Sequence, residues 1–106
     1  MGKDEIIKIL RNEKEVIRIK YKADLKGIFG SVARGEENEN SDIDILAEFQ
    51  PKATLLDLSG IKISLEERLG KKVDILSTRS INPEFVKYIY EDLILLWETW
   101  NSILKI

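Results

Sequence analysis

Hydrophobic positions recur at helical spacing in two long segments of the chain. Over residues 4–22 they alternate with charged positions in a way that predicts an amphipathic helix, with a candidate break near Asn12. Residues 54–69 show the same spacing, where Thr54 is suited to cap the helix start and Gly70 to end it in a left-handed conformation. The expected buried face of the first helix consists of Ile6, Ile9, Leu10, Ile17 and Tyr21. That of the second consists of Leu55, Leu58, Ile61, Leu65 and Leu69.

Three shorter segments have the pattern of strands. Residues 25–29 are mostly apolar and are followed by Gly30, which predicts a buried strand that ends in a tight turn. Residues 42–49 alternate, with Asp42 and Asp44 on one side and apolar side chains on the other. Residues 72–76 predict a third strand, which contains Asp74.

The remaining segments complete an alternation of helices and strands. Residues 31–34 predict a short helix, residues 35–40 a polar and acidic connection, and residues 83–92 a helix that begins at a proline. Residues 93–97 suit either a last strand or a continuation of that helix. The expected class is therefore α/β or α+β with a small mixed sheet. The chain length of 106 residues predicts a single domain over residues 1–106.

The amino-acid composition excludes several kinds of catalytic and metal site. The chain contains no cysteine and no histidine, which excludes disulfides, thiolate nucleophiles, imidazole bases and Cys/His zinc sites within it. Its net charge of −2 argues against broad binding to nucleic acid or anionic membrane, so we expect neither as a partner. Without a long apolar run, a cytoplasmic location is the default expectation. Any acid, base or metal chemistry has to use carboxylates.

The strand pattern places such carboxylates together. Asp42 and Asp44 are two residues apart in a predicted strand, so their side chains point to the same face, about 6–7 Å apart at the Cβ atoms. Asp74 lies in the next predicted strand, where a third carboxylate could complete a metal site and accept a proton from a hydroxyl. Oxygen ligands without histidine or cysteine favour Mg²⁺ or Mn²⁺ over zinc.

The segment before these aspartates has the features of a phosphate-binding turn. Gly30 allows the backbone to approach a phosphate closely, and the Ser31 hydroxyl can donate to its oxygens together with amides of the following helix. Arg34 adds a cation on the same short helix, which suits a triphosphate. A turn-closing glycine, a capping serine and a surface arginine are the alternatives at these positions.

The combination of GSVARG at 30–35, SDIDIL at 41–46 and VDIL at 73–76 resembles the nucleotidyltransferases related to DNA polymerase beta, and most closely their minimal nucleotidyltransferase (MNT) branch. The resemblance implies the minimal nucleotidyltransferase fold. It also implies that Gly30 and Ser31 hold the β and γ phosphates of ATP. Asp42, Asp44 and Asp74 would be catalytic residues and ligands of Mg²⁺, with two ions expected.

Proteins of this branch resemble the antitoxins of modules in which the toxin is an all-helical HEPN ribonuclease. The resemblance implies transfer of AMP from ATP to a tyrosine of such a toxin, which would silence it. Two alternatives stay open: a binding module that neutralises its partner by occlusion, and nucleotidyl transfer to a small molecule. A homo-oligomer also stays open. The aromatic residues near the C-terminus suit either core packing or a partner surface; they are Tyr88, Tyr90, Trp97 and Trp100.

Overall fold

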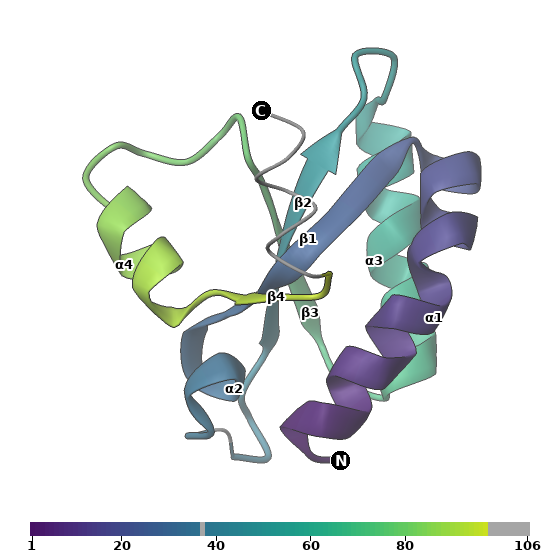
Figure 1. Ribbon diagram of the computed structural model, residues 1–106. Coiled ribbons are helices and arrows are strands. Elements are labelled where there is room, and N and C mark those ends of the chain that lie inside the picture. Colours follow the sequence, from purple (N-terminus) through teal and green to yellow (C-terminus); the bar gives the residue numbers. More distant parts are fainter. Residues whose placement is uncertain (37, 98–106) are drawn as a thin grey trace.

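A computed structural model describes residues 1–36 and 38–97, which form four helices and four strands (Figure 1). In chain order these are α1 (Lys3–Tyr21), β1 (Ala23–Phe29), α2 (Gly30–Arg34), β2 (Ile43–Phe49), α3 (Leu55–Leu69), β3 (Val73–Ser77), α4 (Val86–Asp92) and β4 (Ile94–Leu95). The predicted alternation of helices and strands is confirmed. Strand β2 begins one residue later than expected, so Asp42 directly precedes it.

The strands form one mixed sheet in the order β3-β2-β1-β4. Strands β1 and β2 are antiparallel, whereas β2 and β3 are parallel and are connected through α3. Strand β4 pairs antiparallel with β1 through Ile94 and Leu95, so residues 93–97 do not continue the preceding helix. The expected α/β class with a small mixed sheet is confirmed.

Helices α1 and α3 pack side by side and cover one face of the sheet, while α2 and α4 lie together on the other side of β1 (Figure 1). The core between the two long helices and the sheet takes the alternate residues Ile43, Ile45 and Ala47 of β2. Because side chains alternate along a strand, Asp44 points to the opposite face. Burial of Ile43, Ile45 and Ala47 thus determines that Asp44 lies on the face of the sheet away from the two long helices. The helices contribute Ile6, Leu10, Ile17, Ile61, Leu65 and Leu69 to this core.

Helix α1 is continuous, so the expected break near Asn12 is wrong. Asn12 is exposed, where its weak helix propensity costs little, and the next residue, Glu13, is buried at 6% exposure. Glu13 Oε1 lies 3.1 Å from Nε of Arg68 on α3, which ties the two helices together. The helices also meet where the Tyr21 ring lies so close to Gly60 that an added Cβ would overlap it. Tertiary contacts outweigh local propensity here.

Helix α3 begins as predicted with Thr54 as its cap. The Thr54 hydroxyl accepts a hydrogen bond from the Leu56 amide at 3.2 Å, and Asp57 Oδ2 accepts one from the Thr54 amide at 2.8 Å. Gly70 ends the helix with φ of 65°, also as predicted. The expected burial of Leu55 is wrong, because the helix reaches the core only from Ile61 onward and Leu55 is 79% exposed.

We expect Thr54→Ala to lower the free energy of unfolding by about 1 kcal/mol, since it leaves amides of the first helical turn without their acceptor. Chemical denaturation followed by circular dichroism measures this change. Thr54→Ser is the matched control, because it keeps the hydroxyl and should stay close to the wild-type stability. Equal losses in both variants would contradict the capping role.

Helix α4 is shorter than predicted and begins at Val86 instead of Pro83. The residues before it form a turn, in which the Asn82 carbonyl accepts from the Phe85 amide at 2.8 Å and Asn82 Oδ1 accepts from the Glu84 amide at 3.0 Å. These hydrogen bonds give the Glu84 and Phe85 amides acceptors on Asn82, so this segment needs no helical hydrogen bonds. None of the residues of α4 is buried.

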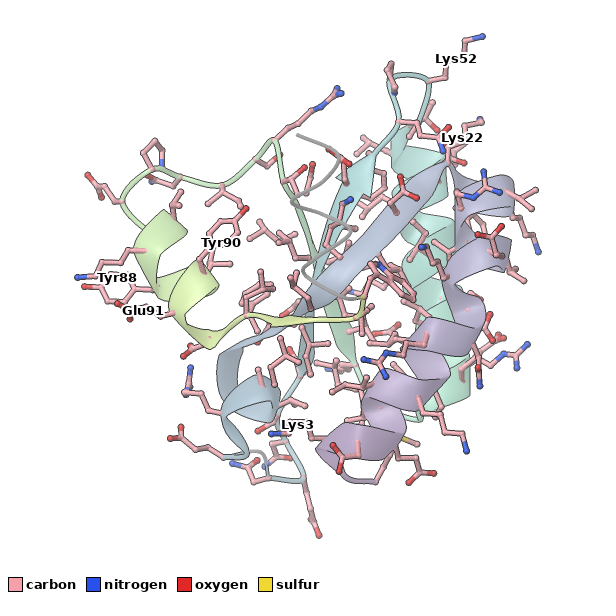
Figure 2. All side chains as sticks on the ribbon, viewed as in Figure 1. Lys3, Lys22, Lys52, Tyr88, Tyr90 and Glu91 are labelled. Carbon is pink, nitrogen blue, oxygen red and sulfur yellow. The ribbon has the colours of Figure 1, made fainter. Side chains whose placement is uncertain are left out.

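The aromatic residues near the C-terminus do not share one role. Tyr88 and Tyr90 on α4 are 64% and 52% exposed, so core packing does not account for them (Figure 2). Trp97 packs against the core, and its Nε1 donates a hydrogen bond to the Leu25 carbonyl at 2.6 Å. Trp100 lies outside the described residues.

None of the helices described by the structure combines the length and the apolar character needed to cross a membrane.

Candidate active site

The acidic face of the sheet brings two of the three predicted carboxylates into register. Asp44 on β2 and Asp74 on β3 are partners in the parallel ladder, where adjacent strands are about 4.8 Å apart. Asp44 is half-buried and Asp74 is exposed, so the pair lies at the surface of the sheet. Asp42, just before β2, is also partly exposed. The expected proximity of Asp44 and Asp74 follows from the pairing of their strands.

Gly30 forms the turn between β1 and α2 directly beside Asp44. Its φ of 75° lies in the left-handed region that favours glycine. A Cβ built on Gly30 would overlap Oδ2 of Asp44, so a larger residue here would displace that carboxylate. Phe29, the residue before it, is the ladder partner of Asp44 on the β1 side. The position of the Asp44 carboxylate therefore depends on the absence of a side chain at residue 30.

Ser31 follows as the second residue of α2 and is partly exposed, whereas Val32 and Ala33 of the same helix are buried. These two apolar contacts fix the short helix against the sheet. The Ser31 side chain thus stays at the surface, next to the turn that contacts Asp44. This placement suits a hydroxyl that donates to a phosphate oxygen.

The pKa of Asp44 is raised from 3.8 to about 6. Partial burial is the main cause, followed by the negative charges of Asp74 and Asp42, while the charge of Arg34 acts in the opposite direction. The carboxylates thus form a negative cluster that their surroundings compensate only in part. A bound cation would relieve this repulsion.

Asp74→Asn should lower the pKa of Asp44, because it removes the larger of the two repulsive charges. Since burial remains, we expect the pKa to stay above its ordinary value. Titration of the Asp44 carboxyl carbon by NMR measures this directly. Glu48→Gln is the control. The Glu48 side chain lies on the same strand, is 53% exposed and pairs with Lys26, so its replacement should leave the pKa of Asp44 unchanged. An Asp44 pKa that does not respond to Asp74→Asn would refute the coupling.

Arg34 lies at the end of α2 and has two carboxylate partners. Its Nε donates to Glu36 at 2.9 Å and its Nη1 donates to Asp92 at 2.6 Å. These hydrogen bonds raise the pKa of Arg34 above its ordinary value, the bond to Glu36 more than the bond to Asp92. Asp92 belongs to α4 and is 58 residues away along the chain, so no local spacing in the sequence indicated this contact.

The donor set at this face fits a divalent cation with oxygen ligands. Among the described residues, no group of three or more acidic side chains is arranged so that it could hold a metal ion by itself. Asp44 and Asp74 nevertheless offer neighbouring carboxylates whose repulsion a cation would offset, and Mg²⁺ is commonly held by one or two carboxylates together with phosphate oxygens. The residues present therefore fit Mg²⁺ bound together with a nucleotide.

A separate groove of about 480 Å³ lies at the other ends of β2 and β3. Its lining is mostly apolar and includes Phe49, Leu55, Leu58 and Ile75. None of the three aspartates lines it, and it offers no acidic side chain for the chemistry described above. The candidate active site is therefore the acidic face and not this groove.

Comparison with known sequences finds a matching family model and several similar proteins. A family model described as polymerase beta nucleotidyltransferase matches residues 4–101. A Methanocaldococcus jannaschii protein provisionally named a protein adenylyltransferase is 46% identical over 91 residues, which cover 85% of this chain and 93% of the relative. The protein adenylyltransferase MntA of Thermococcus cleftensis is 33% identical over 91 residues, covering 86% and 92% of the two chains.

Solved structures share the fold. A protein provisionally described as a minimal nucleotidyltransferase superposes with a TM-score of 0.69 and 36% identity, over 89% of this chain and 95% of the other. A structure of a tri-AMPylated Shewanella oneidensis HEPN toxin in complex with MNT antitoxin gives a TM-score of 0.62 and 19% identity, over 92% and 78% of the chains. At that identity the second match shows the fold alone.

Proposed function

Because this chain belongs to the polymerase beta nucleotidyltransferase family, we propose that it transfers AMP from ATP to a hydroxyl group of a partner protein in a Mg²⁺-dependent reaction. The observation that carries the proposal is the pairing of Asp44 with Asp74 beside the Gly30 turn. One strand ladder and one turn place the carboxylates and the phosphate-binding candidates at the same face of the sheet.

The residues of this face have separate roles in nucleotidyl transfer: phosphate binding, metal binding and proton transfer. Gly30 and Ser31 bind the β and γ phosphates, and Arg34 adds a positive charge beside them. Asp42, Asp44 and Asp74 would hold Mg²⁺ together with the triphosphate, and the ion would neutralise negative charge on the phosphates and polarise the α-phosphate. The acceptor oxygen forms a bond to the α-phosphorus, the bond to the β-phosphate oxygen breaks, and pyrophosphate leaves. Asp74 takes the proton of the acceptor hydroxyl.

We further propose that the acceptor is a tyrosine of a HEPN toxin, with this chain as the antitoxin. The names of the sequence relatives support protein adenylylation, and the fold is that of an MNT antitoxin found in complex with an AMPylated HEPN toxin. The reaction needs only positioning and charge neutralisation, which agrees with a chain that lacks histidine and cysteine.

Radiolabelled ATP tests the type of reaction. The chain is incubated with a purified HEPN partner, Mg²⁺ and ATP labelled at either the α or the γ phosphate. We expect label on the partner from α-labelled ATP, none from γ-labelled ATP, and none when EDTA removes the metal. Transfer of the γ label would identify a kinase. Neutralisation of the toxin without either label would indicate a binding module that acts by occlusion.

A further inference from the structure

Helix α4 contacts α2 and β1, and a short ion pair connects its last residue to Arg34. Asp92, the last residue of α4, accepts the hydrogen bond from Arg34 Nη1 at 2.6 Å. The Asp92 side chain is 26% exposed and that of Arg34 42%. Arg34 ends the short helix α2, which begins at Gly30, the residue whose added Cβ would overlap the Asp44 carboxylate.

The ion pair is poorly suited to a purely structural role. Pairs between partly exposed charges contribute little to stability. Helix α4 adds no buried residue to the core, and the strand that follows it is held separately by backbone pairing with β1. We therefore expect the ion pair to affect the orientation of the Arg34 side chain more than the stability of the protein.

The geometry points to Asp92 as a positioning residue that holds the Arg34 guanidinium ready for the phosphates of ATP, a role that rests on the proposed function. An arginine side chain is long and loses conformational freedom when it binds a phosphate. Asp92 on Nη1 and Glu36 on Nε restrict the guanidinium before the nucleotide arrives, which reduces this cost. Arginine has five N–H donors, so two monodentate contacts leave donors available for a phosphate.

Asp92→Asn tests this role, because asparagine keeps the size but removes the charge. Binding is measured by isothermal titration calorimetry with Mg²⁺ and a non-hydrolysable ATP analogue on the full chain. We expect the dissociation constant to rise about fivefold to tenfold in Asp92→Asn, and Asp92→Glu to restore part of the affinity.

Glu91→Gln is the matched control on the same helix. The Glu91 side chain is 56% exposed, lies 3.9 Å from Lys87, and points away from the sheet beside Tyr88 (Figure 2). It should bind the analogue as wild type does. An Arg34→Gln background separates positioning from a general effect on the fold: if Asp92 acts through Arg34, adding Asp92→Asn to Arg34→Gln should weaken binding no further.

The results separate this inference from the proposed function. Wild-type affinity in Asp92→Asn, tighter binding in Asp92→Asn, or a full additional loss in the Arg34→Gln background would overturn the positioning role while the proposed function stands. Absence of nucleotide binding by the wild-type chain would overturn both.

Discussion

Asp44→Asn is expected to reduce AMP transfer by about 10³-fold or more and, at the same time, to stabilise the metal-free protein at neutral pH. Activity falls because Asp44 is a proposed Mg²⁺ ligand, paired with Asp74 across the β2–β3 ladder and next to the Gly30 turn. Stability rises because asparagine removes a charge that burial and two other carboxylates disfavour.

The pH dependence of this stability effect has a defined sign. The Asp44 pKa is about 6 in the folded chain, above its ordinary value of 3.8, so the folded state binds the proton more tightly than the unfolded state. The stabilising effect of that proton is fully present below pH 4 and is lost as the pH rises through 6. A shift of this size corresponds to about 3 kcal/mol for a fully buried group, and solvent screening of a half-exposed carboxylate reduces it to about 1 kcal/mol.

Denaturation at several pH values in the presence of EDTA measures this effect. We expect Asp44→Asn to differ little from wild type at pH 4 and to be more stable by about 1 kcal/mol at pH 7. Glu48→Gln, an exposed carboxylate on the same strand, should show neither the stabilisation nor the loss of transfer. Full transfer activity in Asp44→Asn would refute the catalytic role, and destabilisation at pH 7 would refute the account of its pKa.

Gly30→Ala is expected to lower transfer by about 10²-fold through displacement of the Asp44 carboxylate. The added methyl group meets two obstacles: a left-handed backbone with φ of 75°, and an overlap with Asp44 Oδ2. The strain of the left-handed conformation alone costs about 1–2 kcal/mol. The overlap adds to this cost and moves Asp44, the proposed metal ligand.

Gly35→Ala is a matched control for the strain of the left-handed backbone conformation. Gly35 has a φ of 74°, almost the same as that of Gly30, but a Cβ added there has no heavy atom within 4 Å. We therefore expect Gly35→Ala to lose about 1 kcal/mol of stability and little activity. Equal losses of transfer in the two variants would show that the turn conformation matters and the contact with Asp44 does not.

Much of the site could be predicted from the sequence because its elements have local causes. The alternation of residues 42–49 determined the face of Asp44, and the parallel pairing of β2 with β3 then placed Asp74 beside it. The turn at Gly30 and the cap at Thr54 were likewise predictable, since each depends on residues close in sequence. The roles of Gly30, Ser31, Arg34 and the three aspartates in catalysis remain predictions.

The features that the sequence did not indicate depend on contacts between distant residues. The ion pair between Arg34 and Asp92 joins α2 to α4, and no periodicity marks either residue as its partner. The continuity of α1 at Asn12 is supported by the ion pair between the buried Glu13 and the exposed Arg68 of another helix. The exposure of Leu55 depends on how far the core extends along α3.

Intact-mass spectrometry of a purified HEPN partner shows whether this chain transfers AMP to protein. The partner is incubated with ATP, Mg²⁺ and either the wild-type chain, Asp44→Asn or Glu48→Gln. We expect a gain of one or more AMP masses with wild type and Glu48→Gln, and no gain with Asp44→Asn. A stable complex whose partner gains no AMP with the wild-type chain would contradict this expectation.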